Sequence, residues 1–370
     1  MGPTLADSKA TTDLVNIPPR QTGPNVWYGP QVASQESTWL FILTAQELAE
    51  LEVAADRIVE DSAVSSSSST LSLRLLSSLD NNFNLKNLRA RIDSLVANNL
   101  NSGLGFFVWR GIPNEWSHAR KCAAFLLIGK CIGNLRQQNG KGHVLGHVKD
   151  LGLDSSDPNV RVYQTRERQT FHTDSSDVVG LLCLRTAASG GHSSLVSSAT
   201  VFNEMLATRP DLAHRLLLPM AKDRRGEIPS GCLPYFNIPV FHWYEGHLSA
   251  IYQRQYIDSA QRFPTAKRLT KEDVEALDLF DSLCDDERLN FTMVLAPGDL
   301  QFCNNHALLH DRTAFVDHPD DKRHLLRVWV APEGARPLPP VYAERYSSIK
   351  VGDRGGVYVP GVEPVAPLHP

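Results

Sequence analysis

The sequence lacks the cysteine patterns of disulfide-rich and zinc-binding proteins. Its six cysteines are scattered, with no CxxC pair and no Cys/His finger spacing, which argues against a disulfide framework or a structural zinc ribbon. Long apolar runs are also lacking, since residues 123–128 and 178–184 are the longest and a membrane-spanning helix needs about 20 residues. No apolar run follows a basic start within residues 1–20, as it would in a signal peptide. We therefore expect a reduced, cytoplasmic protein that does not enter a membrane.

An excess of charge of one sign is absent as well. The chain has 37 Lys and Arg against 41 Asp and Glu, a formal net charge of −4. Such a balance gives no general attraction to phosphate backbones or anionic lipid. We therefore do not expect nucleic acid as the main partner.

The remaining composition is that of a globular protein with a large core. Of the 370 residues, 42% are apolar and 21% are charged, and a chain of this length needs no covalent cross-links to hold its core. Residues 1–37 carry five prolines and little periodicity, which predicts an extended arm. We find no linker farther along the chain, so residues 38–370 are expected to form a single domain.

Local patterns predict mainly short strands with helices at the periphery. Thr44 and Glu47 form a capping-box pattern before an amphipathic helix, and the serines of 65–69 form a low-complexity loop. Residues 105–111 are an aromatic and β-branched run typical of a buried strand, and a helix is expected over 116–135. From residue 171 onward, short apolar runs alternate with turns at 178–184, 193–196, 291–295, 300–303 and 325–330. This spacing favours an antiparallel barrel or sandwich over a Rossmann sheet.

The most informative segment is the sequence QTFHTD at 169–174. Residues i and i+2 of an extended chain point to the same side, so His172 and Asp174 can converge on one ion. Two histidines and one carboxylate form the facial triad of non-haem Fe(II) oxygenases. A single HxD pair is weak evidence, because chance supplies somewhat under one per chain of this composition. A second pair, His318 and Asp320, lies in a Pro/Asp-rich stretch typical of a solvated loop.

Five segments that follow one another along the chain support a metal-binding role for His172 and Asp174. They read GFFVWRG, FHTD, GGHSS, PGDLQFCNNHALLHDRTAF and RHLLRVWV. With them the sequence resembles the taurine/2,4-D dioxygenase-like (TauD/TfdA) family of Fe(II)/2-oxoglutarate oxygenases, especially its fungal-type members. The resemblance covers about residues 105–332. It implies a double-stranded β-helix, a jelly-roll or cupin-like barrel with flanking helices, whose core is that range.

The resemblance also implies a cofactor site. His172, Asp174 and His310 match the ligands of the iron, Fe(II), and 2-oxoglutarate and O₂ are the implied cosubstrates. Arg327 matches the arginine that holds the distal carboxylate of 2-oxoglutarate, Arg323 the second basic residue near the metal end, and Ser193 the assisting hydroxyl, with the adjacent Ser194 as the alternative register. A planar guanidinium suits a carboxylate because it donates two charge-assisted hydrogen bonds.

The residues alone leave alternatives open. His306 is four residues from His310 and either could be the distal ligand; the family register selects His310. His143 and His147 are interpreted as surface or lid residues, and Arg323 could be only a surface cation. The same His/Asp/His set could hold zinc in a hydrolase, or the barrel could be a binding module without catalysis.

For the substrate, we expect a small molecule, plausibly amino-acid-derived or an intermediate of fungal secondary metabolism. Its oxidation at an unactivated C–H bond would be hydroxylation, desaturation or oxidative cyclisation. Residues 140–157 resemble a lid over the site. A homodimer is one assembly that we consider. The candidate pocket residues, for each of which core packing is the competing interpretation, are Tyr163, Gln169, Phe171, Phe241, Trp243, Tyr252 and Arg254.

Overall fold

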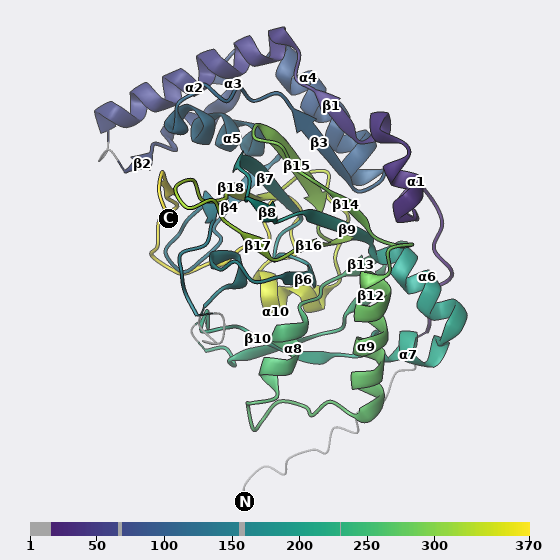
Figure 1. Ribbon diagram of the computed structural model, residues 1–370. Coiled ribbons are helices and arrows are strands. Elements are labelled where there is room, and N and C mark those ends of the chain that lie inside the picture. Colours follow the sequence, from purple (N-terminus) through teal and green to yellow (C-terminus); the bar gives the residue numbers. More distant parts are fainter. Residues whose placement is uncertain (1–15, 66–68, 155–159, 230) are drawn as a thin grey trace, which may run out of the picture.

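Two antiparallel sheets packed face to face form the centre of the molecule (Figure 1). The computed structural model describes residues 16–65, 69–154, 160–229 and 231–370. The larger sheet has the order β1-β3-β15-β7-β18-β4, with β5 also paired to β18. Its strands are β1 (Leu40–Ile42), β3 (Phe106–Arg110), β15 (Asp299–Asn304), β7 (Val178–Arg185), β18 (His324–Ala331), β4 (Asn134–Arg136) and β5 (Gly146–Val148). The pairing of β1 with β3 is the parallel one in this sheet.

The smaller sheet has the order β14-β9-β16-β6. Its strands are β14 (Phe291–Met293), β9 (Ser193–Ser197), β16 (Leu308–Arg312) and β6 (Gln169–His172). Apolar side chains from the facing sides of both sheets, among them Phe106, Val179 and Leu195, form one continuous core between them. The architecture is the double-stranded β-helix that the sequence resemblance implied.

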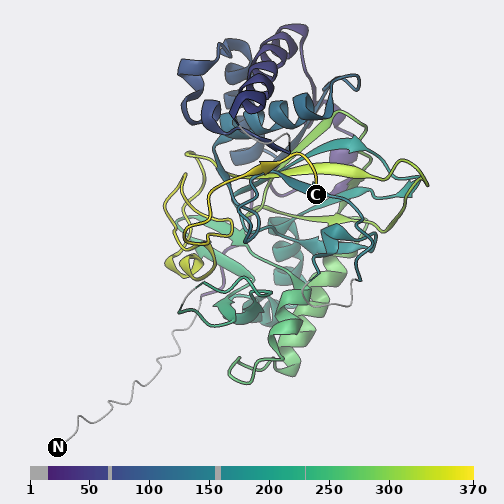
Figure 2. The same cartoon turned by 90° about the vertical axis from the view of Figure 1, so that its left-hand side faces the viewer.

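Helices cover the outer face of each sheet, so that the molecule has four layers (Figure 2). Against the larger sheet lie α2 (Ala45–Ser65), α4 (Lys86–Leu95) and α5 (His118–Ile132), which share a second core with Phe107, Leu182 and Val328. Against the smaller sheet lie α6 (Ser198–Thr208), α7 (Pro210–Arg215) and α9 (Lys271–Asp285), which share a third core with Val196 and Leu309. The side chains of successive strand residues thus alternate between an inner and an outer core.

Smaller elements complete the fold. The hairpins β10–β11 and β12–β13, and the helix α8 that follows them, lie beside the smaller sheet. Short pairs β8–β17 and β2–β19 close the edges, and α3 and α10 are single turns. Their bounds are β10 (Met220–Asp223), β11 (Tyr235–Ile238), β12 (Phe241–Tyr244), β13 (His247–Ala250), α8 (Arg254–Ala260), β8 (Ser189–Gly190), β17 (Phe315–Val316), β2 (Thr70–Leu71), β19 (Ala366–Pro367), α3 (Leu79–Asn82) and α10 (Ala343–Tyr346).

The local predictions for the first 70 residues have different outcomes. The capping box at the start of α2 is present, since the Thr44 backbone N–H donates to Glu47 (2.8 Å) and the Glu47 N–H donates to the Thr44 hydroxyl (3.2 Å). The arm differs from the expected extended chain, because α1 (Gly29–Ala33) and a 3₁₀ turn at Glu36–Thr38 interrupt it. Its first 15 residues and residues 66–68 of the serine-rich loop lie outside the described residues. The division into an arm and one domain stays a prediction.

Within the described part of the chain, every helix is too short or too polar to cross a bilayer.

Candidate active site

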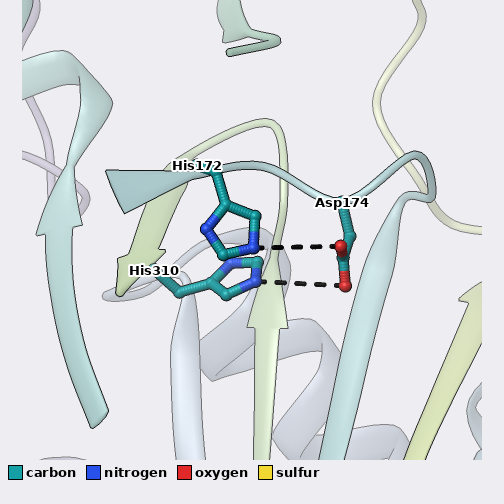
Figure 3. Close-up of side chains that lie close together, drawn as sticks. All are labelled: His172, Asp174 and His310. Atoms are coloured by element: carbon teal, nitrogen blue, oxygen red, sulfur yellow. Dashed lines mark ion pairs between the residues drawn. The ribbon is translucent and has the colours of Figure 1, made fainter. Parts of the chain in front are cut away.

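The two histidines and the aspartate of the predicted triad meet at one point between the sheets. His172 is the last residue of β6 and lies opposite His310 of β16 in the antiparallel register. Asp174 follows two residues after β6, where the chain leaves the sheet (Figure 3). One ligand atom from each of the three side chains lies within 4.8 Å of the other two. His172 and Asp174 are buried and His310 is partly buried.

The orientation and charge of these groups fit a divalent cation. The Asp174 carboxylate oxygens lie 4.0 Å from Nε2 of His172 and 3.9 Å from Nε2 of His310. Nδ1 of His172 lies 2.8 Å from the Thr170 carbonyl, which requires the proton on Nδ1 and leaves the Nε2 lone pair facing the aspartate. Burial lowers the pKa of His172 and brings that of His310 to about 3. Both imidazoles are therefore neutral ligands at physiological pH.

A set of donors keeps Asp174 charged and oriented. Burial alone would raise its pKa, but the Arg327 guanidinium and the hydrogen bond from Trp329 hold the pKa of Asp174 below its ordinary value. The Trp329 indole N–H donates to one carboxylate oxygen at 2.8 Å, and Arg327 Nη1 donates to the same oxygen at 3.2 Å. The Asp174 backbone N–H donates to the side chain of Asn305 (3.2 Å). These contacts preorganise an anionic ligand.

The two predicted cosubstrate arginines lie at different distances from this centre. Arg327 is held beside Asp174, with its Nε donating to the Gln138 side chain at 2.8 Å. Arg323 lies four residues earlier on the same chain segment, about 13 Å away in an extended chain, and its Nη2 donates to the Gly191 carbonyl (3.1 Å). Within the described structure, Nη1 of Arg323 is buried without a hydrogen-bond partner. Arg327 thus contacts the metal centre, which is the position that the resemblance suggested for Arg323.

Two connected cavities open onto the triad. The larger has a volume of about 340 Å³ and is lined by His172, Asp174, Arg327 and loop residues. The smaller runs between the sheets and is lined by all three triad residues together with Ser193, Arg312 and Arg323. Ser193 donates to Gln301 (3.0 Å), whereas Ser194 hydrogen-bonds Thr292 (2.7 Å). Of the two serines, Ser193 is the one that lines the inner cavity.

Two of the predicted pocket residues line the cavities. The Tyr163 ring lies 4.6 Å from the Arg327 guanidinium carbon. The Gln169 side-chain nitrogen lies 2.8 Å from Nε2 of His172.

The other predicted pocket residues lie elsewhere, which corrects the expectation. Phe171 and Phe241 are buried in the core beneath α6 and α9, and Tyr252 packs there too and donates to Asp281 (2.5 Å). Trp243 is 40% exposed on β12. Arg254 forms ion pairs with three aspartates, Asp258, Asp278 and Asp281. The strand alternation that turns His172 inward turns Phe171 outward, a signal already present in the sequence.

The remaining histidines have structural positions. His306 Nε2 lies 2.7 Å from Asp177, which also accepts from Arg354 (2.9 Å), so His306 is separate from the triad. His147 is buried in β5 with its Nδ1 at 2.9 Å from His324, where a surface or lid residue was expected. Part of the expected lid is therefore a strand, although residues 140, 141, 143, 146, 147 and 151 do line the larger cavity. Residues 155–157 of that lid lie outside the described residues.

Sequence reasoning missed several residues of the cavity wall. They come from loops and from the short helices α8 and α10, far apart in the chain, and carry no recognisable motif: Gln138, Arg161, Arg225, Glu227, Tyr256 and Arg345. Of these residues, only Gln138 could have been expected from its type, because a buried glutamine can accept a hydrogen bond from a buried arginine. Its contact with Arg327 follows only once β4 is known to pair with β18.

Comparisons with known proteins agree with the geometry. Residues 74–329 match the family model of the taurine catabolism dioxygenase TauD, TfdA family. The chain is 30% identical over 328 residues to FR-33289 synthase of Streptomyces rubellomurinus, covering 86% of this chain and 92% of that protein. It is 30% identical over 260 residues to the taurine hydroxylase-like protein SAT17 of Stachybotrys chartarum, covering 66% of each chain. These relatives are bacterial as well as fungal, so the fungal-type assignment is not confirmed.

The fold agrees with solved structures at low sequence identity. Asparagine oxygenase, crystallised with Fe(II), 3-hydroxyasparagine and succinate, matches with a TM-score of 0.59 at 18% identity, covering 79% of this chain and 93% of that one. The non-haem iron oxygenase OrfP with Fe and α-ketoglutaric acid matches with a TM-score of 0.57 at 14% identity, with the same coverage. The match to the family model, together with the relative at 30% identity, argues against the zinc-hydrolase and binding-module alternatives. The chain belongs to the TauD/TfdA family and is a 2-oxoglutarate-dependent non-haem iron dioxygenase that uses Fe(II), 2-oxoglutarate and O₂.

Proposed function

We propose that the protein oxidises an unactivated C–H bond of a small natural-product-type molecule, with His172, Asp174 and His310 holding the iron. The observation that carries this proposal is the convergence of the three side chains, within 4.8 Å, where the two cavities meet. Bound iron would supply O₂ activation coupled to the decarboxylation of 2-oxoglutarate. The protein supplies neutral imidazoles and an oriented carboxylate. Hydroxylation is the default outcome.

We place 2-oxoglutarate in the inner cavity with its distal carboxylate on Arg323 and Ser193. The distal carboxylate is the one at the end of 2-oxoglutarate that does not bind the metal. Arg327 is already committed to Asp174 at the metal centre (3.2 Å), whereas Arg323 keeps a buried Nη1 without a partner. A second cation, Arg312, lines the same cavity, and burial lowers the pKa of both guanidinium groups to about 10. An anion between them would relieve the cost of burying these charges.

The substrate would occupy the larger cavity, beside Tyr163 and Gln169. Relatives are named for natural products and nucleotides: a uridine-5'-phosphate dioxygenase of Amycolatopsis is 32% identical over 203 residues, covering 50% of this chain and 71% of that protein. Solved structures of similar fold contain hydroxylated asparagine and arginine. These names support a small polar substrate for this cavity, in bacterial or fungal metabolism alike.

The assignment of the iron ligands is tested with His172→Ala and Asp174→Ala. Each removes one of three ligands, so we expect loss of iron binding and of succinate formation from 2-oxoglutarate. The exposed His318, from the second HxD pair, offers a matched control in His318→Ala. Binding is followed anaerobically by the weak visible band of the Fe(II)/2-oxoglutarate complex. Normal succinate release by either ligand variant, with its fold intact by circular dichroism, would contradict the assignment.

A further inference from the structure

The wall of the larger cavity carries an excess of positive charge. Part of it comes from Arg225 in the loop between β10 and β11 and from Arg345 in α10, elements that do not contribute to the inner cavity. Among the described residues of the wall, five side chains are cationic and two are carboxylates: Lys141, Arg161, Arg225, Arg327, Arg345, Asp174 and Glu227. The whole chain, by contrast, has a net charge of −4. The cavity wall is therefore positive although the chain as a whole is slightly negative.

The two carboxylates are already occupied. Asp174 faces the metal site and Arg327. Glu227 forms an ion pair with Arg161 at 2.8 Å and lies 3.9 Å from Arg345. A substrate ammonium group would have to compete with these guanidinium groups for Glu227. The wall is thus unsuited to the cationic end of an amino acid and suited to an anion.

Arg225 provides an independent sign of a ligand. It has a positive φ of 53°, a backbone conformation that is costly for a residue other than glycine. Its backbone N–H donates to Asp223 at 2.8 Å, which holds the turn, and its guanidinium lies over the Tyr256 ring at 5.5 Å. Within the described structure, its Nε is buried without a hydrogen-bond partner. The fold therefore holds, in a strained turn on the cavity wall, an arginine whose buried Nε–H has no hydrogen-bond partner among the described residues.

We propose that the substrate carries a phosphate or phosphonate group and that Arg225 and Arg345 bind it, while the carbon to be oxidised extends toward the triad. This inference rests on the proposed function, since it assigns the substrate of the same cavity. A phosphate-type group brings a charge of about −1.5 to −2 and three oxygens. It can accept hydrogen bonds from donors on several sides, whereas one planar guanidinium satisfies a carboxylate. Arg345 already donates through Nε to Ser175 (3.0 Å), which orients its remaining N–H groups.

The test measures binding of methylphosphonate by calorimetry, with and without Fe(II) and 2-oxoglutarate under anaerobic conditions. Acetate and L-asparagine serve as comparison ligands. The main variant is Arg225→Gly, because glycine accepts the positive φ and so preserves the turn while removing the guanidinium. Arg225→Lys keeps the charge without the planar donor set. Arg209→Ala is the control, since Arg209 is an exposed arginine paired with Asp211 and Glu275.

We expect methylphosphonate to bind the unaltered protein more tightly than acetate or asparagine. Arg225→Gly should weaken this binding about tenfold or more, the effect of losing a hydrogen bond to a charged group, and Arg345→Ala should do the same. Arg225→Lys should fall between, and Arg209→Ala should match the unaltered protein. Equal binding of methylphosphonate by Arg225→Gly and the unaltered protein, or a preference for asparagine, would overturn the proposal.

Substrate-independent succinate release separates the two proposals. If Fe(II)-dependent decarboxylation of 2-oxoglutarate persists while methylphosphonate fails to bind, the phosphonate inference is wrong and the proposed function stands. If decarboxylation and the visible Fe(II)/2-oxoglutarate band are both absent while methylphosphonate binds through Arg225, the proposed function fails and the anion site stands.

Discussion

Replacing Arg323 by methionine should weaken cosubstrate binding and strengthen the fold. Arg323 is 5% exposed, and within the described residues its Nη1 has no hydrogen-bond partner. Burial lowers its pKa from 12.5 to about 10. Because the folded protein binds this proton less tightly than the unfolded chain, the charged arginine destabilises the fold at every pH below about 10. The shift corresponds to a cost on the order of 3 kcal/mol.

Arg323→Met removes that cost while keeping much of the side chain's apolar packing. Its guanidinium carbon lies 5.2 Å from the Phe315 ring, and a methionine sulfur can pack against the same ring. The variant also loses the hydrogen bond from Arg323 to the Gly191 carbonyl, which offsets part of the gain. We therefore expect the free energy of unfolding to rise by about 1–3 kcal/mol. The apparent KM for 2-oxoglutarate should rise about 10- to 100-fold, the cost of a lost charge-assisted bond to its carboxylate.

Urea unfolding with and without 2-oxoglutarate, together with succinate kinetics, provides the assay. 2-Oxoglutarate should stabilise the unaltered protein and have little effect on Arg323→Met. Arg185→Met is the matched control, because Arg185 is an exposed arginine ion-paired with Asp321 (3.1 Å). An unchanged KM in Arg323→Met, combined with a steeply raised KM in Arg327→Ala, would refute the placement of the distal carboxylate and restore the order implied by the resemblance.

Two further predictions concern stability. Gly180→Ala should lower the free energy of unfolding, measured in urea, by about 1–3 kcal/mol. A Cβ at Gly180 of β7 would lie 2.5 Å from the Phe302 ring and 2.9 Å from Val328 on the neighbouring strands. An unfolding midpoint equal to that of the unaltered protein would show that the sheet can shift. Acidification should also destabilise the fold. Burial lowers the pKa of His147 to about 4 and that of His324 to about 3, so the unfolded chain binds protons at these histidines at a higher pH than the folded protein does. Each histidine should therefore lower the free energy of unfolding by about 2 kcal/mol at pH 5 relative to pH 8. A His324→Gln variant should show a flatter pH profile over this interval, and an equally steep one would exclude this histidine as the cause.

Local chemistry made part of this protein predictable from its sequence. The HxD spacing was sufficient to bring His172 and Asp174 to one side of an extended chain, since side-chain direction there depends only on the period of two. The capping box at Thr44 and the glycine-bounded strand at 105–111 likewise depend on neighbours in the chain. The choice of His310 over His306 came from the family register, and the structure agrees because His310 pairs with His172 across β6 and β16.

The tertiary structure alone decided what each distant residue faces. Arg327 lies in β18 and Arg323 directly precedes this strand, so their spacing along the chain was predictable. Only the fold places Arg327 against Asp174 and Arg323 against the Gly191 carbonyl. The sequence suggested Arg254 and Tyr252 as pocket residues, but in the structure both side chains hydrogen-bond to Asp281 of α9. The cationic cavity wall joins loops separated by up to about two hundred residues, and long-range burial, not local pattern, sets the charge and the unpaired donors there. The sequence by itself determined the chemistry at the iron, while only the packing of the loops decided what the cavity can bind.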